Sequence, residues 1–383
     1  MLNDIERLRA QGLFRALRSF DWRRILNFCS NDYLGLAEDP RVVEATIDVV
    51  RRFGAGSGSA RLISGNFSLC EELESGFAAF KGTESALLFN SGYHANIGAI
   101  PALAGEGDVI FSDELNHASL IDGCRLSKAE KVVYRHNDLN QLEEMLRRGA
   151  VLAPGRENPA PTKKIIVTEA FFSMEGDLCP LNDLLTIAEK YDATVYLDEA
   201  HAVGVFGEEG EGLAPKNPPE RLICMGTLGK AFGSYGAFVA GSKTVRDYLI
   251  NKARSFIFST ALPPAAVGAS LAALQIIRDE PERRRRLWEN VHRVGANLCV
   301  RPKEGRHAGL PLQSPIVSIP IGDAKKTMEI SERLLDEGIY LQGIRPPTVP
   351  EGTSRLRLTV SATHTEGQIQ KLLSALADVG ISI

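Results

Sequence analysis

Short apolar runs alternate with helical segments through the middle of the chain, and this rhythm constrains the fold more than any other feature. The runs are rich in Val, Ile, Leu and Phe, and there are seven of them: Ser85–Asn90, Asp108–Ser112, Lys131–Tyr134, Lys164–Thr168, Thr194–Asp198, Arg221–Met225 and Ala237–Ala240. Near-continuous apolar strands separated by helices indicate a parallel sheet covered on both faces. We therefore predict an α/β domain with a mainly parallel seven-stranded sheet flanked by helices.

The order of elements changes on both sides of this region. Residues 2–19 carry apolar side chains at near-helical spacing, and residues 41–80 resemble two helices around a Gly-Ser-rich loop at Gly54–Ser59. After a helical stretch from Pro264 to about residue 300, two strands and two helices are predicted, at Pro315–Ile321, 325–337, Arg355–Val360 and 366–379. We predict an N-terminal segment (1–40), a large α/β domain (41–265) and a smaller α+β C-terminal domain (266–383).

Composition is that of an ordinary globular protein, with 44% hydrophobic and 24% charged residues among 383 and a net charge of −4. The basic run Glu282–Leu287 is interpreted as a solvated helix face, the alternative being a site for anionic ligands. Without interleaved aromatic residues it does not predict nucleic-acid binding. No apolar run is long enough to span a membrane. The six cysteines (Cys29, Cys70, Cys124, Cys179, Cys224 and Cys299) are scattered, which favours a reduced, cytoplasmic protein without a metal site.

An acidic residue ends one of the predicted buried strands. Val195–Leu197 is apolar, and Asp198, Glu199, Ala200 and His201 follow directly. Open α/β sheets bind ligands at the carboxyl ends of their strands, so Asp198 is a candidate partner for a cationic group. The alternative is an acid that caps the next helix.

A lysine follows the next strand in a glycine-rich context, in the sequence Thr227-Leu228-Gly229-Lys230. Lysine is the amine that condenses with aldehyde cofactors, although a surface lysine is the alternative. A third segment, Asn90–Asn96, joins a strand to a helix. Its Ser and Gly residues expose backbone N–H groups at a helix N-terminus, which suits a phosphate, although a tight turn is equally compatible with them.

The three segments together predict one cofactor. A lysine for an aldehyde, an acid for a pyridine nitrogen and a cradle for a phosphate are the groups that pyridoxal phosphate (PLP) requires. Each alternative remains open for its segment alone, but their combination favours a PLP site in which Lys230 forms a Schiff base with the cofactor.

The sequence also resembles the α-oxoamine synthases of the fold-type I PLP enzymes along nearly its whole length. The resemblance is carried by Asn27–Leu36, Gly56–Gly65, Asp198–His201, Thr227–Gly233 and Ile344–Pro350. Phe258–Pro264 and Ile344–Pro350 favour the oxononanoate-forming branch of that family. Cys70 stands where relatives usually have histidine, which we interpret as a packing change in front of a helix.

The resemblance implies roles for individual residues. Catalysis is assigned to Lys230, His117 and Asp198. The cofactor-binding residues are Lys230, Asp198, His201, Thr227, Ser173, Gly92, Tyr93 and His117. The substrate-binding residues are Asn31, Arg357, Arg345, Thr348 and Arg15.

The activity implied is the decarboxylative condensation of L-alanine with a pimeloyl thioester, carried by CoA or a carrier protein. The resemblance also implies a homodimer with shared active sites, in which Ser259 or Thr260 reaches the neighbouring subunit's phosphate. One alternative is a related synthase that uses glycine or serine with another acyl-CoA. The other is a catalytically silent subunit of the same fold, although the presence of Lys230, Asp198 and His201 argues against it.

Overall fold

The computed structural model describes residues 2–148, 163–298 and 312–381. Contacts within the chain divide it into two compact units. The large unit comprises Gly35–Phe172 and Leu178–Pro281, and the small unit comprises Met1–Leu34, Ser173–Asp177 and Glu282–Ile383. The large unit therefore continues beyond the predicted boundary at residue 266.

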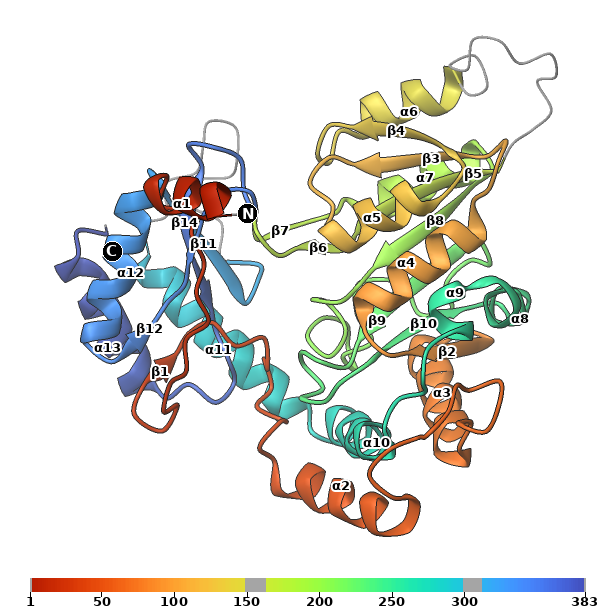
Figure 1. Cartoon of the computed structure of the whole chain (residues 1–383), viewed down its shortest axis with the longest axis horizontal. Helices are drawn as coiled ribbons and strands as arrows, with labels where there is room; N and C mark the ends of the chain where they lie inside the picture. Colours follow the sequence, from red (N-terminus) through yellow and green to blue (C-terminus); the bar gives the residue numbers. More distant parts are fainter. Residues whose placement is uncertain (1, 149–162, 299–311, 382–383) are drawn as a thin grey trace. The chain divides into compact units, whose positions relative to one another are not determined.

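A seven-stranded sheet forms the centre of the large unit, as the sequence predicted (Figure 1). Its order is β2-β10-β9-β8-β5-β3-β4. The strands are β2 (Ser85–Phe89), β3 (Val109–Asp113), β4 (Glu130–Tyr134), β5 (Lys164–Glu169), β8 (Ala193–Asp198), β9 (Leu222–Thr227) and β10 (Ala237–Gly241). Only β10 runs antiparallel to its neighbours β2 and β9, so the mainly parallel sheet is confirmed.

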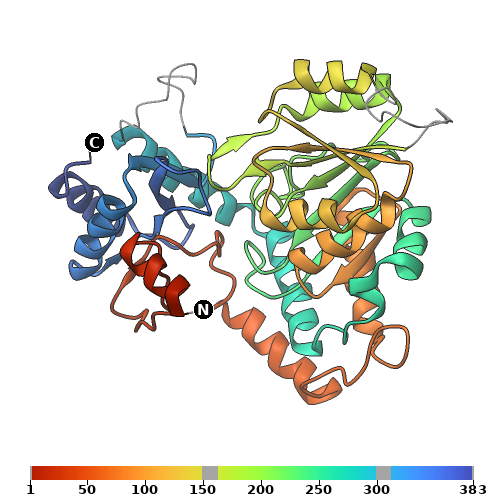
Figure 2. The same ribbon diagram turned by 45° about the horizontal axis from the view of Figure 1, so that its top comes forward.

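Alternate side chains of these strands enter two different hydrophobic cores, as the two-residue period of a strand requires. Ile165, Val167 and Tyr196 pack beneath α4 (Gly92–Leu103), α5 (Ala118–Leu126), α8 (Lys243–Lys252) and α9 (Arg254–Ile257). Ile166 and Val195 face α6 (Leu139–Arg148) and α7 (Leu181–Lys190) on the other side. Figure 2 shows the sheet between these two helical layers. Short strands β6 (Phe171–Phe172) and β7 (Asp177–Leu178) lie between β5 and α7 in the sequence.

Three further helices complete the large unit. The two helices expected around the Gly-Ser-rich loop are α2 (Pro40–Phe53) and α3 (Ser68–Lys81). The first half of the long helical stretch is α10 (Pro264–Asp279), which packs on both of them and so belongs to this unit. Cys70 lies inside the first turn of α3, not in front of the helix as predicted, and it is buried.

The small unit contains the predicted pair of strands and helices. β11 (Ile316–Gly322) and β13 (Gly343–Ile344) flank β14 (Ser354–Thr359), and α12 (Ala324–Asp336) and α13 (Glu366–Asp378) accompany this sheet. β1 (Leu26–Asn27) pairs with β12 (Ile339–Tyr340). In α11 (Pro281–Asn297), Arg285 and Arg286 are exposed, but Arg284 is buried, so the predicted solvated face does not include it.

The helix predicted for residues 2–19 is only half formed. α1 ends at Ala10, and Gly12 then adopts a left-handed backbone with φ of 66°. The amides of Leu13 and Phe14 both bond back to the Leu8 carbonyl oxygen, which closes the helix end. Glycine readily takes this conformation and commonly ends helices. The apolar periodicity therefore continued past the true end of the helix.

The described residues include five of the six cysteines. Cys299 lies outside the described residues. The other five cysteines are free. Within the described ranges, no helix has both the length and the apolar character needed to cross a bilayer.

His364 makes the stability of the small unit depend on pH. Its Nδ1 accepts a hydrogen bond from the Ser361 amide (3.0 Å), and its Nε2 lies 3.1 Å from the Asn27 carbonyl oxygen. Burial lowers the pKa of this imidazole below its usual value of 6.5. A depressed pKa means that protonation costs more in the folded state, so the stabilisation is present above pH 6.5 and is lost as the pH falls through the folded pKa.

We therefore expect the free energy of unfolding to fall between pH 7 and pH 5 more steeply in the wild type than in His364→Phe, which keeps the ring packing on Phe28. Chemical denaturation at a series of pH values measures this difference. His292→Phe, at an exposed position on α11, is the matched control. Parallel pH profiles for the wild type and His364→Phe would contradict the assignment.

Candidate active site

A cavity of about 220 Å³ opens at the carboxyl ends of the parallel strands. β2 and β9 are each antiparallel to β10, so β2 has the same direction as the other parallel strands. Its end therefore meets those of β3, β5, β8 and β9 at one edge, where open α/β sheets bind ligands. The lining residues all belong to the large unit: Gly92, Tyr93, Asn96, His117, Ser119, Glu169, Asp198, Ala200, His201, Met225, Thr227 and Lys230.

Lys230 and His201 meet inside this cavity. Lys230 lies in the loop between β9 and β10, and His201 follows β8. The lysine Nζ is 2.9 Å from His201 Nε2, and His201 is buried while Lys230 is half-buried. The structure thus brings together the two residues that the sequence assigned to the anchoring amine and to a hydrogen bond with the cofactor.

Asp198 occupies the last position of β8 and is buried. Its Oδ1 accepts a hydrogen bond from the Ala200 amide (2.8 Å), and its Oδ2 accepts one from Asn96 Nδ2 (2.9 Å). Both donors hold the carboxylate in a fixed orientation in the cavity wall. A carboxylate oxygen has more than one lone pair, so Asp198 can still accept a bond from a ligand.

His117 is the residue immediately before α5. Its backbone amide donates to Glu169 Oε1 (2.6 Å), and its Nδ1 is 2.8 Å from Ser119 Oγ. Desolvation by the surrounding protein and the nearby charge of Lys230 lower the pKa of the imidazole, and the charge of Asp198 opposes this shift. At neutral pH the ring is therefore uncharged, as suits a flat surface for stacking on a heterocycle.

The N-terminus of α4 lies at the same edge of the sheet. Ser91 caps the helix by accepting a bond from the His94 amide (3.2 Å), and Gly92 and Tyr93 begin the first turn. A Cβ on Gly92 would stand 3.6 Å from Met225 and 4.0 Å from Thr227, within the cavity lining. Gly92 and Tyr93 both line the cavity, and backbone N–H groups in the first turn of a helix can bind a phosphate.

Glu199, the residue after Asp198, forms a buried ion pair with Lys81 of α3. The Nζ–Oε2 distance is 2.5 Å, and the two side chains are 1% and 0% exposed. The amides of Leu213 and Ala214 donate to the other carboxylate oxygen. Burial by itself would lower the pKa of Lys81, but the charge of Glu199 raises it above its usual value. The pair fixes the segment that carries Asp198 and His201.

Arg357 contacts two of the other predicted residues, Ser173 and Asn31, within the small unit. Arg357 is 8% exposed, and its guanidinium donates to the Ser173 carbonyl oxygen (3.0 Å), Asn31 Oδ1 (3.1 Å) and Thr359 Oγ1 (3.1 Å). All of these acceptors are neutral. A buried guanidinium held by neutral oxygens keeps its positive charge for an anionic ligand.

A second group in the small unit contains Arg15, Arg345 and Thr348. Arg15 donates to Thr348 Oγ1 (3.1 Å), and Arg345 donates to the carbonyl oxygen of Phe14 (2.6 Å). Burial and the positive charges of Arg15 and Arg18 lower the pKa of Arg345 below its usual value. The Arg345 Nε is buried and has no hydrogen-bond partner among the residues that the structure describes. This concentration of positive charge suits a carboxylate or a phosphate.

The sequence did not identify every residue of the cavity. Asn96 and Glu169 both line it and bond to assigned residues, but neither had been given a role. Asn96 was within the Asn90–Asn96 segment, and Glu169 is the last residue of β5, one position beyond the predicted strand. The contact between Asn96 and Asp198 depends on how α4 packs against β8, so the sequence could not predict it. Glu169 lies at a strand end, and that position could have identified it as a site residue.

A model of the family described as aminotransferase class I and II matches residues 23–376 of the chain. The chain belongs to this family. The match covers every residue that lines the larger cavity, from Gly92 to Lys230.

Three similar proteins show which members of the family this chain resembles. The 8-amino-7-oxononanoate synthase of Geotalea daltonii is 47% identical over 394 residues, covering 98% of this chain and 96% of the relative. The solved structure of a serine palmitoyltransferase variant from S. paucimobilis, with a bound PLP–myriocin aldimine, superimposes with a TM-score of 0.88 at 29% identity, covering 99% of this chain and 97% of the other. The solved 8-amino-7-oxononanoate synthase of Francisella tularensis gives a TM-score of 0.75 at 29% identity, covering 93% and 98%.

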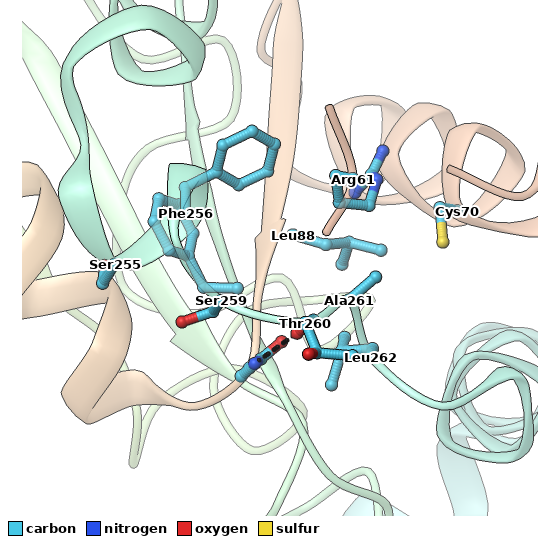
Figure 3. A pocket seen from close by; sticks show the side chains of 11 residues that line it. Arg61, Cys70, Leu88, Ser255, Phe256, Ser259, Thr260, Ala261 and Leu262 are labelled. Atoms are coloured by element: carbon cyan, nitrogen blue, oxygen red, sulfur yellow. Dashed lines mark hydrogen bonds between the residues drawn. The ribbon is translucent and has the colours of Figure 1, made fainter. Parts of the chain in front are cut away.

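A second, much smaller cavity lies in the large unit of this family member (Figure 3). Its volume is about 10 Å³, enough for about one water molecule. Ser259 and Thr260 line it together with Arg61 and Cys70, and Asn90 Nδ2 donates to the Thr260 carbonyl oxygen (2.8 Å). Within the described residues, no cluster of His, Cys, Asp or Glu in either cavity or elsewhere is arranged to hold a metal ion.

The Lys81–Glu199 pair gives a prediction for stability. Lys81→Met removes the cation but leaves the Glu199 carboxylate buried, which costs about 3–5 kcal/mol. We expect the free energy of unfolding to fall by this amount in chemical denaturation. Arg221→Met, which removes the exposed pair with Asp192, is the control and should cost less than about 1 kcal/mol. If the free energy of unfolding fell equally in the two variants, the buried pair would stabilise the protein no more than the exposed pair does.

Proposed function

We propose that the protein is an 8-amino-7-oxononanoate synthase. It uses PLP to condense L-alanine with a pimeloyl thioester and releases CO2 and the free thiol. One observation carries this proposal: the Lys230 amine, the His201 ring, the Asp198 carboxylate and the first turn of α4 all line one cavity. The near-full-length similarity to proteins with this name supports the choice of substrates.

The groups in the cavity fit PLP. Lys230 has the primary amine that an aldehyde requires, and the first turn of α4 at Gly92 and Tyr93 offers N–H groups for the phosphate. Asp198 would accept a hydrogen bond from the pyridine nitrogen, and His201 and Thr227 can bond to polar groups of the cofactor. The uncharged His117 ring would stack on the pyridine ring. We assign Ser173 to the cofactor as well.

When bound, PLP supplies an electron sink that stabilises negative charge at the Cα of an amino acid. The chain supplies the proton transfers and the orientation. The Lys230 amine, freed when the amino acid takes its place, is the base for the α-proton. Its pairing with His201 at 2.9 Å keeps it within the cavity. The new C–C bond forms between Cα and the thioester carbonyl carbon, and the thiolate leaves. The carboxylate of alanine then departs as CO2, and the proton held by Lys230 returns to Cα.

Charged groups of the small unit would bind the two carboxylates of the substrates. Arg357 and Asn31 are assigned to the carboxylate of alanine. The oxygens of Ser173, Thr359 and Asn31 that accept hydrogen bonds from the guanidinium are neutral, and Asn31 bonds to it directly. Arg15, Arg345 and Thr348 are assigned to the pimeloyl donor, whose far end is a carboxylate. Guanidinium groups bind such anions with paired hydrogen bonds.

A turnover assay tests the function. Protein loaded with PLP should release CO2 and free thiol from L-alanine and pimeloyl-CoA. Glycine, which lacks the methyl group, should react more slowly by roughly tenfold or more. Lys230→Ala should lose both turnover and the absorbance band of the lysine-bound cofactor, whereas Lys243→Ala, an exposed lysine at the start of α8, should retain both.

Two outcomes of this assay would redirect the proposal. Faster turnover with glycine or serine, or with a different acyl chain, would make the protein another α-oxoamine synthase. A protein that takes up no PLP would be a silent member of the fold. A pimeloyl group on a carrier protein, compared with pimeloyl-CoA in the same assay, identifies the preferred donor.

We also propose that the protein is a homodimer and that the segments around Ile63 and Phe258 form part of its interface. These side chains are 81% and 70% exposed, which is unusual for large apolar groups. Their segments lie side by side, because Ala60 and Thr260 form a β-bridge and the Ala261 amide donates to Ser59. We assign Ser259 or Thr260 of this surface to the phosphate of the neighbouring subunit's cofactor.

A single charge in this surface should weaken the dimer. In analytical ultracentrifugation we expect the wild type to sediment with twice the mass of one chain and Phe258→Glu to dissociate at low concentration. Val133→Glu is the control, because Val133 is exposed on β4 at the opposite edge of the sheet from β2. A wild-type monomer with full activity would contradict the shared active site.

A further inference from the structure

Asn96 is a buried amide in the lining of the cavity, and it hydrogen-bonds to three residues on two other elements. It lies on α4 and is 0% exposed. Its Nδ2 donates to Asp198 Oδ2 on β8 (2.9 Å) and to Ser119 Oγ on α5 (2.8 Å). Its Oδ1 accepts from the Tyr196 hydroxyl, also on β8 (2.9 Å). Both N–H groups and the carbonyl oxygen therefore have partners.

The Tyr196 hydroxyl fixes which way the amide faces. Tyr196 is fully buried, and burial together with the charge of Asp198 raises the pKa of its hydroxyl well above the usual value. The hydroxyl therefore keeps its proton and donates it to an acceptor. This requires Oδ1 of Asn96 on the Tyr196 side, and so leaves the NH2 group facing Asp198 and Ser119.

The same amide is connected to two residues that the proposed function assigns to the cofactor ring. One is Asp198, which Asn96 contacts directly. The other is His117, whose Nδ1 lies 2.8 Å from the same Ser119 Oγ that accepts from Asn96. Asn96 thus links the carboxylate assigned to the pyridine nitrogen with the imidazole assigned to the ring face.

Packing alone does not account for an asparagine here. Its neighbours on α4, Ala95 and Ala99, belong to the apolar core between α4 and the sheet. Burying an amide in such surroundings is unfavourable unless its polar atoms are bonded, whereas leucine of similar size would add apolar contact. A polar side chain at this position is therefore explained by the groups that it orients.

We propose that Asn96 is a positioning residue that holds the Asp198 carboxylate against the cofactor's pyridine nitrogen and so maintains the protonation of that nitrogen. This inference rests on the proposed PLP site. It assigns Asn96 no contact with the substrate. The amide acts through Asp198, by fixing the direction of one carboxylate oxygen.

The experiment compares the pyridine nitrogen in wild type and Asn96→Leu, each loaded with ¹⁵N-labelled PLP, by ¹⁵N NMR. We expect the resonance in Asn96→Leu to move towards that of the unprotonated nitrogen. Asp198→Ala defines the full displacement. The exchange of the alanine α-proton with solvent deuterium, measured without an acyl donor, should slow by roughly tenfold to a hundredfold, the effect of losing one hydrogen bond to a charged group.

Two further variants separate positioning from folding. Tyr196→Phe removes only the hydroxyl that orients the amide and should move the resonance in the same direction by a smaller amount. Asn290→Leu is the matched control, because Asn290 is also a buried amide on a helix but bonds to the carbonyl oxygens of Ser361 and His364. It should lower stability and leave the resonance unchanged.

The outcomes distinguish the two proposals. A wild-type protein that binds no PLP overturns the proposed function and this inference with it. A PLP-bound Asn96→Leu whose resonance and exchange rate match those of the wild type overturns only the role of Asn96. If Asn96→Leu does not fold, Tyr196→Phe decides, and an unchanged resonance in that variant counts against the inference.

Discussion

The common direction of the parallel strands is the constraint on which the cavity depends. Six strands of the sheet, β2 included, end at the same edge, and β10 alone runs the other way. The strand ends and the segments that follow them bring His117, Asp198 and Lys230 to one place from widely separated parts of the sequence. Backbone hydrogen bonds between the strands keep those segments at fixed spacing, so the side chains need little further ordering when a ligand binds.

Polar groups buried near this edge stabilise the arrangement in two ways. Lys81 and Glu199 neutralise each other in full burial, and the Leu213 and Ala214 amides complete the carboxylate's hydrogen bonds. Asn96 is neutral and connects Asp198, Ser119 and Tyr196 without adding charge beside the Asp198 carboxylate. The first group fixes the backbone that follows β8, and the second fixes the direction of a side chain. Breaking the hydrogen bonds of either group would cost free energy because the polar atoms are buried, and each group holds its residues in a defined geometry.

Much of the fold could be predicted because each strand is an apolar run with its own local signal. All seven strands of the large sheet were predicted, and so were α2, α3, α12 and α13. The N-terminal helix was predicted too long, because Leu13, Phe14 and Leu17 continue the apolar spacing after Gly12 has ended the helix. The large unit extends through α10, because that helix packs on α2 and α3. The sequence near residue 266 does not show which helices α10 will contact, so the domain boundary was predicted too early.

The sequence by itself determined the elements and the chemical groups: the strand pattern, and the lysine, acid and histidine that follow strand ends. These are local properties, since apolar spacing and residue type are read along the chain. Only the tertiary structure decided which groups meet. Lys230 Nζ lies 2.9 Å from His201 Nε2, Arg357 bonds to Asn31 across more than three hundred residues, and Asn96 reaches Asp198 from another element. Such contacts depend on how helices pack on a sheet, and the spacing of residues in one chain does not specify that packing.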